Sequence, residues 1–144
     1  MARGPLPADA GEAVSWVVEL PGQPPSWNAS YRIARQRGSR ADGANYSFST
    51  MVKTKKLVQW QEEMTMVVRT AKPSRWSPPP KTFIPIAWEV FLTNHIDMDN
   101  LQKAINDVVE AATGVNDKWF YPIFRLPVVG VPQRQARVVL TIGD

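Results

Sequence analysis

Carboxylate side chains gather in one short segment of a chain that is otherwise basic. The segment reads Asp97-Met98-Asp99-Asn100-Leu101-Gln102-Lys103, and it continues to Asp107 and to Asn116-Asp117. Carboxylate oxygens are the ligands that hard divalent cations such as Mg²⁺ require. The segment therefore predicts a metal site, and a metal site in a cationic protein indicates chemistry on a polyanion.

A predicted strand leads into the first two acids. Residues 82–93 alternate between apolar and other side chains, which is typical of a buried strand. Asp97 and Asp99 follow this strand and are two residues apart, so in an extended segment both carboxylates lie on one face. We therefore expect Asp97 and Asp99 to share one metal ion.

A predicted helix carries the next charged side chains. From about residue 100 to residue 112, apolar side chains recur at helical spacing. Asp99, Lys103 and Asp107 follow one another at intervals of four and share the opposite face. Asn116-Asp117 stands just before a second extended run. We therefore expect Asp97, Asp99, Lys103 and Asp107 to face a common region.

The other periodic segments complete a small α/β fold. Residues 14–20 and 134–142 read as strands, and residues 54–71 have one apolar stripe at helical spacing. The order strand, loop, helix, strand, helix, strand, strand predicts a mixed β-sheet with two main helices in a single small domain. The expected divisions are a flexible leader over residues 1–12, one domain over 13–144, a basic mobile loop over 32–50 and a proline-rich connector over 72–81.

Composition limits the class of protein. With 144 residues, 44% of them hydrophobic, the chain is long enough for one domain with a modest core. It contains no cysteine, which excludes disulfides and thiolate metal sites. No apolar run is long enough for a signal peptide or a membrane span, so we expect a cytoplasmic protein without a membrane partner.

Opposite charges are segregated along the chain. The formal net charge is +4, and residues 32–56 hold seven basic residues against the single acid Asp42. The basic residues are Arg32, Arg35, Arg37, Arg40, Lys53, Lys55 and Lys56. Lysine and arginine neutralise phosphates and release counterions, so this zone is a candidate DNA-binding surface, with a solvated face as the alternative. Lys55 and Lys56 begin the predicted helix, where the helix dipole disfavours positive charge unless phosphate is bound there.

The acidic segment resembles the signature of the RusA-type crossover junction endodeoxyribonucleases, a family often carried by phages and prophages. That signature is Asp-x-Asp-Asn-(x)₂-Lys, a helical aspartate, a glycine, and an acidic pair before a strand; residues 96–117 are similar to it in residue type, order and spacing. Pro24-Pro25-Ser26-Trp27-Asn28 is similar to the family's N-terminal Pro-Ser-x-Asn element. The chain departs from the signature at Asn116-Asp117, where the family usually has two adjacent acids, and the interval after the helix is one residue shorter.

The resemblance implies a RusA-like fold and a homodimer that cuts four-way DNA junctions symmetrically with Mg²⁺ or Mn²⁺, in the bacterial host cytoplasm if the chain is phage-encoded. Carried over by position, Asp97, Asp99 and Asp117 are the essential acids and metal ligands, Lys103 is the essential lysine, and Asp107 is a further candidate ligand. Carboxylate-held Mg²⁺ can supply the activated water and the charge neutralisation that phosphodiester hydrolysis needs. Lys103 would stabilise charge on the phosphate or orient the water.

Tryptophans in predicted loops are candidates for stacking on unpaired bases at a junction. Trp27, with its neighbour Asn28, and Trp76 lie in such loops. Trp60 and Trp88 lie on the apolar faces of a predicted helix and a predicted strand, so they are expected to pack in the core.

Four other interpretations remain for the same residues. An EF-hand loop starting at Asp97 would need glycine and glutamate where Gln102 and Val108 stand. An Asp-x-Asp nucleotide-sugar transferase would need a longer donor domain and a phosphate-binding glycine loop. Surface acids that merely cap a helix would fit Asp99 as the N-cap but leave Asp97 and Asp117 unexplained. A noncatalytic module that recognises branched DNA with the same fold is the main alternative function.

Overall fold

Alternating side chains build the central sheet of this computed structural model, which describes residues 15–26, 31–39 and 45–143. Three strands, β1 (Trp16–Pro21), β4 (Ile84–Leu92) and β7 (Arg137–Ile142), bury every second residue, so their apolar side chains share one face. The strand order is β1-β7-β4-β5, where β5 is Phe120–Phe124, and the short β6 (Val128–Val129) also pairs with β4. The sheet is mixed, because β1 and β4 run antiparallel to β7 while β5 and β6 run parallel to β4.

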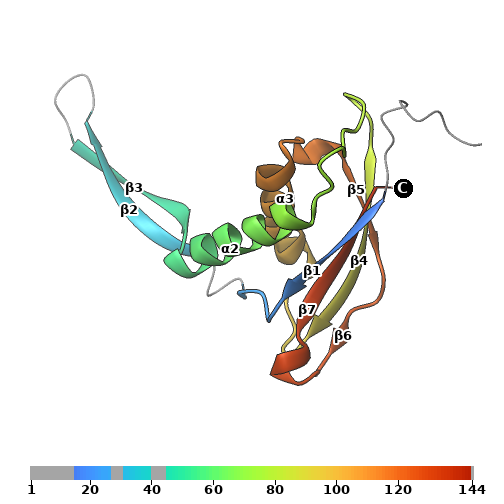
Figure 1. Cartoon of the computed structure of the whole chain (residues 1–144). Coiled ribbons are helices and arrows are strands. Elements are labelled where there is room, and N and C mark those ends of the chain that lie inside the picture. The colour runs from blue at the N-terminus through green and yellow to red at the C-terminus, as the bar shows by residue number, and fades with distance from the viewer. Residues whose placement is uncertain (1–14, 27–30, 40–44, 144) are drawn as a thin grey trace, which may run out of the picture.

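Two helices cover the apolar face of the sheet and leave the other face open (Figure 1). They are α2 (Lys55–Ala71) and α3 (Met98–Thr113), and they pack against each other. The predicted α/β fold with a mixed sheet and two main helices is therefore confirmed. Neither helix, within the described ranges, has the length and apolar character of a membrane span.

The packed face of α3 is continuous and apolar. Its buried residues are Leu101, Ala104, Ile105, Val108, Val109 and Ala112, which recur at helical spacing. Together with Ile86, Trp88 and Val90 of β4 they form the centre of the core. Burial of this stripe fixes the rotation of the helix, so the charged residues of α3 are held on its outer side.

A two-stranded arm replaces the predicted loop over residues 32–50. β2 (Tyr31–Ser39) and β3 (Asn45–Lys53) pair antiparallel with each other, form a separate sheet and project from the start of α2 (Figure 1). The loop prediction is wrong for these strands, which pair with each other and not with the central sheet. Alternation of apolar and polar residues is short here, as in Tyr46-Ser47-Phe48-Ser49, and is interrupted in both strands, so it does not predict them.

The proline-rich segment over residues 72–81 contains no helix or strand, but it is not a solvent-exposed linker throughout. Trp76 is only 6% exposed and meets Trp16 edge to face, with ring centroids 5.5 Å apart. The prediction that Trp76 lies free to stack on DNA is therefore wrong. The turn after Pro73 brings the large indole back onto the end of the sheet, where its burial stabilises the fold.

Candidate metal and nucleic-acid site

The first two acids lie at the N-terminus of α3. Asp97 precedes the helix, and its Oδ1 accepts a hydrogen bond from the backbone N–H of Asp99 at 2.9 Å. Asp97 therefore caps the helix, and both exposed carboxylates lie where the helix dipole favours negative charge. The predicted extended segment is wrong here because the helix already begins at Met98, and the capping role falls to Asp97 instead of Asp99.

Three carboxylates gather beside the C-terminal half of α3. One oxygen each from Asp107, Glu110 and Asp117 lies within 4.8 Å of the other two, and we call this group the acidic cluster. Asp107 and Glu110 are three residues apart and share one helix face. Gly114, at φ 77°, ends the helix, and the turn that follows brings Asp117 of η1 (Asp117–Trp119) back toward that face.

The acidic cluster does not include the two acids at the helix start. Asp99 and Asp107 are eight residues apart on α3, or about 12 Å along its axis. In the described part of the chain, neither Asp97 nor Asp99 belongs to a group of three acids. Lys103 is exposed on α3 between the two sets, one turn before Asp107. One chain therefore brings Asp107 and Asp117 together and separates them from Asp97 and Asp99.

A lysine at the end of the arm is tied to the acidic cluster. Lys53, the last residue of β3, places its Nζ 3.2 Å from Oδ2 of Asp107 and donates to Oε1 of Gln61 on α2 at 3.0 Å. Gln61 in turn donates to the carbonyl of Ala104 at 3.0 Å. These contacts join the arm, α2 and α3 at one point, so the end of the arm that adjoins α2 lies beside the acidic cluster.

Asn116 supports the turn that carries Asp117. Its Oδ1 accepts a hydrogen bond from the backbone N–H of Lys118 at 3.0 Å, which caps η1. Asparagine and aspartate are equally good in this role. The departure from the family signature thus falls on a capping residue, whereas Asp117 points into the acidic cluster.

The predicted DNA-binding residues fall into three groups. Lys55 and Lys56 are exposed in the first turn of α2, a turn without acidic residues, directly after Lys53. The backbone of β2 carries Arg32, Arg35 and Arg37 along the arm. The remaining predicted contacts, Trp27, Asn28 and Arg40, lie outside the described residues, as does the predicted leader over residues 1–12.

The donor atoms of the acidic cluster suit a hard divalent cation. Carboxylate oxygens at 2.0–2.1 Å surround Mg²⁺ in proteins, so two ligands on opposite sides of one ion lie about 4.2 Å apart. The upper limit of 4.8 Å within the cluster is close to this spacing, and small side-chain rotations would close it. Lys53 pairs with Asp107, and a divalent cation would compensate the charge of all three carboxylates together.

Glu110 is the cluster residue that the sequence did not single out. It belongs to the acidic stretch of the chain, but the family signature gives it no role. The available signal was its spacing of three from Asp107 on the outer face of the same helix. Recognising it would also have required the return of Asp117 to that face, which depends on the turn at Gly114.

The sequence matches no protein-family model and no curated protein. Fold, site geometry and the motif in the acidic segment are thus the grounds for a function.

Proposed function

We propose that the chain is a metal-dependent endodeoxyribonuclease that resolves four-way or branched DNA junctions by paired phosphodiester hydrolysis. The observation that carries the proposal is the acidic cluster at the foot of a projecting arm whose sequence is basic. A cation-binding site beside a phosphate-binding surface is what hydrolysis of a polyanion requires. The resemblance of residues 96–117 to the RusA-type signature supports the same conclusion.

The residues have three proposed roles: binding the metal ion, stabilising charge on the phosphate that is cut, and binding the flanking phosphates. Asp107, Glu110 and Asp117 would hold Mg²⁺ or Mn²⁺, which when bound supplies an activated water and neutralises charge on the phosphate. Lys103 lies on the outer side of α3 between the two acidic sets, where an ammonium group would stabilise negative charge on the phosphate. The arginines of the arm and the lysines that begin α2 would bind the flanking phosphates.

A homodimer accounts for the separation of the two acidic sets. Asp99 lies eight residues, or about 12 Å along the axis of α3, from Asp107, so Asp97 and Asp99 lie too far from the acidic cluster to bind the same metal ion in one chain. If two α3 helices meet antiparallel across a two-fold axis, the N-terminus of one helix lies beside the acidic cluster of the other. Two equivalent composite sites result, and two symmetric cuts across a junction need two such sites.

The test is cleavage of a synthetic four-way junction, labelled on each strand in turn, with and without Mg²⁺. We expect Mg²⁺-dependent cuts by the wild type and a loss of at least about a hundredfold in rate for Asp117→Asn and for Asp99→Asn. Glu63→Gln, on the side of α2 that faces residues 23–25, is the matched control and should cleave normally. Undiminished cleavage by Asp117→Asn would refute the assignment.

The same experiment separates the nuclease from the noncatalytic alternative. A module that only recognises branched DNA would bind the junction tightly in gel-shift or anisotropy measurements and would produce no cuts at any Mg²⁺ or Mn²⁺ concentration. Tight binding without cleavage by the wild type would therefore replace the proposed activity with that function.

A further inference from the structure

A cleft lies beside the C-terminal end of α3, where Lys118 and Trp119, the residues that follow Asp117, line it. It has a volume of about 420 Å³, within the range of small-molecule sites, and it lies between the proline-rich segment and the turn after α3. Residues 78–82 line one wall, and residues 114–116 with Lys118 and Trp119 line the other. None of these residues was a predicted site residue.

The cleft contains an aromatic surface held in a fixed orientation. The half-buried ring of Trp119 meets the ring of Phe83 edge to face, with centroids 5.4 Å apart, and Phe83 itself is 63% exposed. The ammonium of Lys118 lies 5.3 Å from the centroid of the Trp119 ring. A planar ligand can take the place of this flexible lysine over the indole.

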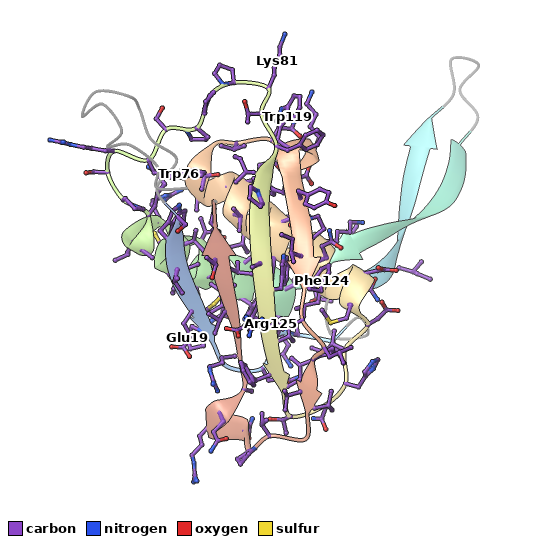
Figure 2. The ribbon with its side chains drawn as sticks, turned by 90° about the vertical axis from the view of Figure 1, so that its right-hand side faces the viewer. Glu19, Trp76, Lys81, Trp119, Phe124 and Arg125 are labelled. Atoms are coloured by element: carbon purple, nitrogen blue, oxygen red, sulfur yellow. The ribbon has the colours of Figure 1, made fainter. Side chains whose placement is uncertain are left out.

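The charges at the cleft favour an anion. Of the described residues that line it, Lys81 and Lys118 are the charged ones, and both are exposed. Lys81 stands at the tip of the loop, on the same end of the molecule as Trp119 (Figure 2). It is also the one described non-glycine residue with a positive φ, 56°. Such strain persists where the surrounding chain imposes it, and it is concentrated at ligand-binding sites.

One turn of 3₁₀ helix connects the cleft to the acidic cluster. Asp117, Lys118 and Trp119 are consecutive in η1, and with three residues per turn their side chains point in three different directions. Asp117 reaches the acidic cluster, while Lys118 and Trp119 reach the cleft. The acidic cluster and the cleft are therefore formed in part by consecutive residues of the chain.

We propose that this cleft binds one unpaired nucleotide of the DNA, with the base on the Trp119 ring and the phosphate between Lys81 and Lys118. The proposal rests on the proposed function, because it takes DNA as the ligand. It adds a reason for junction selectivity: at a branch point a base can leave its stack cheaply, whereas in a continuous duplex it must first unpair. Lys118 would move from the indole to the phosphate as the base arrives.

The test is equilibrium binding of a short oligothymidylate and of a four-way junction, by fluorescence anisotropy in EDTA so that no strand is cut. Trp119→Ala should weaken oligothymidylate binding by roughly 5- to 100-fold, and Trp119→Phe by much less. Lys81→Gln and Lys118→Gln should each reduce the slope of log affinity against log salt by about 0.7. The matched controls are Tyr121→Ala, which removes an exposed aromatic ring on β5, and Arg134→Gln, which removes a charge from the 3₁₀ turn Gln133–Gln135 before β7. Neither control should change the affinity or the salt slope.

Equal binding by Trp119→Ala and Tyr121→Ala, or unchanged salt slopes in both lysine variants, would overturn the proposal. If circular dichroism shows that Trp119→Ala is unfolded, the salt slopes of Lys81→Gln and Lys118→Gln test the proposal instead, and unchanged slopes in both would overturn it. The nuclease proposal is refuted by a different result. If binding by the wild type depends on Trp119 but the wild type never cleaves a junction with Mg²⁺, the nucleotide-binding cleft is supported and the nuclease activity is refuted.

Discussion

Glu110→Gln should change the stability of the protein in opposite directions without and with divalent metal. Glu110 has an oxygen within 4.8 Å of oxygens of both Asp107 and Asp117. Without a metal ion these like charges repel one another, so removing one of them stabilises the folded state. With a metal ion the same carboxylate is a ligand, so removing it weakens binding.

The size of both effects follows from the geometry. Two unit charges 4.8 Å apart in water interact by about 0.9 kcal/mol, and screening at about 0.15 M salt roughly halves this value. Loss of the two repulsive pairs therefore stabilises the metal-free variant by about 1 kcal/mol, which raises Tm by about 3–4 °C for a chain of this size. A metal at a hundred times its Kd stabilises the wild type by about 2.7 kcal/mol, or about 10 °C.

The assay is thermal unfolding in EDTA and in a series of Mg²⁺ or Mn²⁺ concentrations. We expect Glu110→Gln to melt above the wild type in EDTA and below it at saturating metal, so the two curves of Tm against metal concentration cross. Glu63→Gln, which removes an exposed charge outside the acidic cluster, should follow the wild type throughout. A Glu110→Gln protein that is less stable than the wild type in EDTA, or that keeps the full metal-dependent rise, would refute the acidic cluster as a metal site.

Three further outcomes are expected. Asp99→Asn and Asp117→Asn, each inactive alone, should recover cleavage of one strand when refolded together, because a mixed dimer has one composite site with both acids intact; no recovery would show that each site lies within one chain. The double change Arg35→Gln, Arg37→Gln should weaken junction binding and reduce its salt slope by about 2, with Tm unchanged because the arm forms a separate sheet; a large fall in Tm would contradict this packing. Trp76→Ala should destabilise the protein by about 3–5 kcal/mol in urea unfolding without altering junction affinity, since the buried indole packs on Trp16; a loss of affinity at full stability would return Trp76 to the DNA surface.

The elements that bury an apolar face could be predicted from the sequence. β4, α2 and α3 each show the period of their own geometry, and each lies close to its expected range. The arm was not predicted, because alternation of apolar and polar residues is short and interrupted in both of its strands. Trp76 shows the converse: a proline-rich sequence excluded helix and central strand but did not indicate whether the tryptophan was buried.

The candidate site was predicted in part. Motif and spacing identified Asp107 and Asp117, and the structure places both in the acidic cluster. Spacing along a helix gives both the face on which a residue lies and, at 1.5 Å per residue, its distance along the axis. Asp99 and Asp107 share a face, yet they lie two turns apart, and only the return of the chain after Gly114 determines which acids meet. For the same reason the cleft beside Trp119 had no signature in the sequence.

Paired cleavage is tested most directly with a supercoiled plasmid that extrudes a cruciform from an inverted repeat. The cruciform is a four-way junction, and two cuts within the lifetime of one complex convert the supercoiled plasmid directly into the linear form. We predict Mg²⁺-dependent formation of linear plasmid with little nicked circle, no cutting of a matched plasmid without the repeat, and no product with Asp117→Asn. Equal cutting of both plasmids, or no cutting of either by the wild type, would contradict a junction-resolving nuclease.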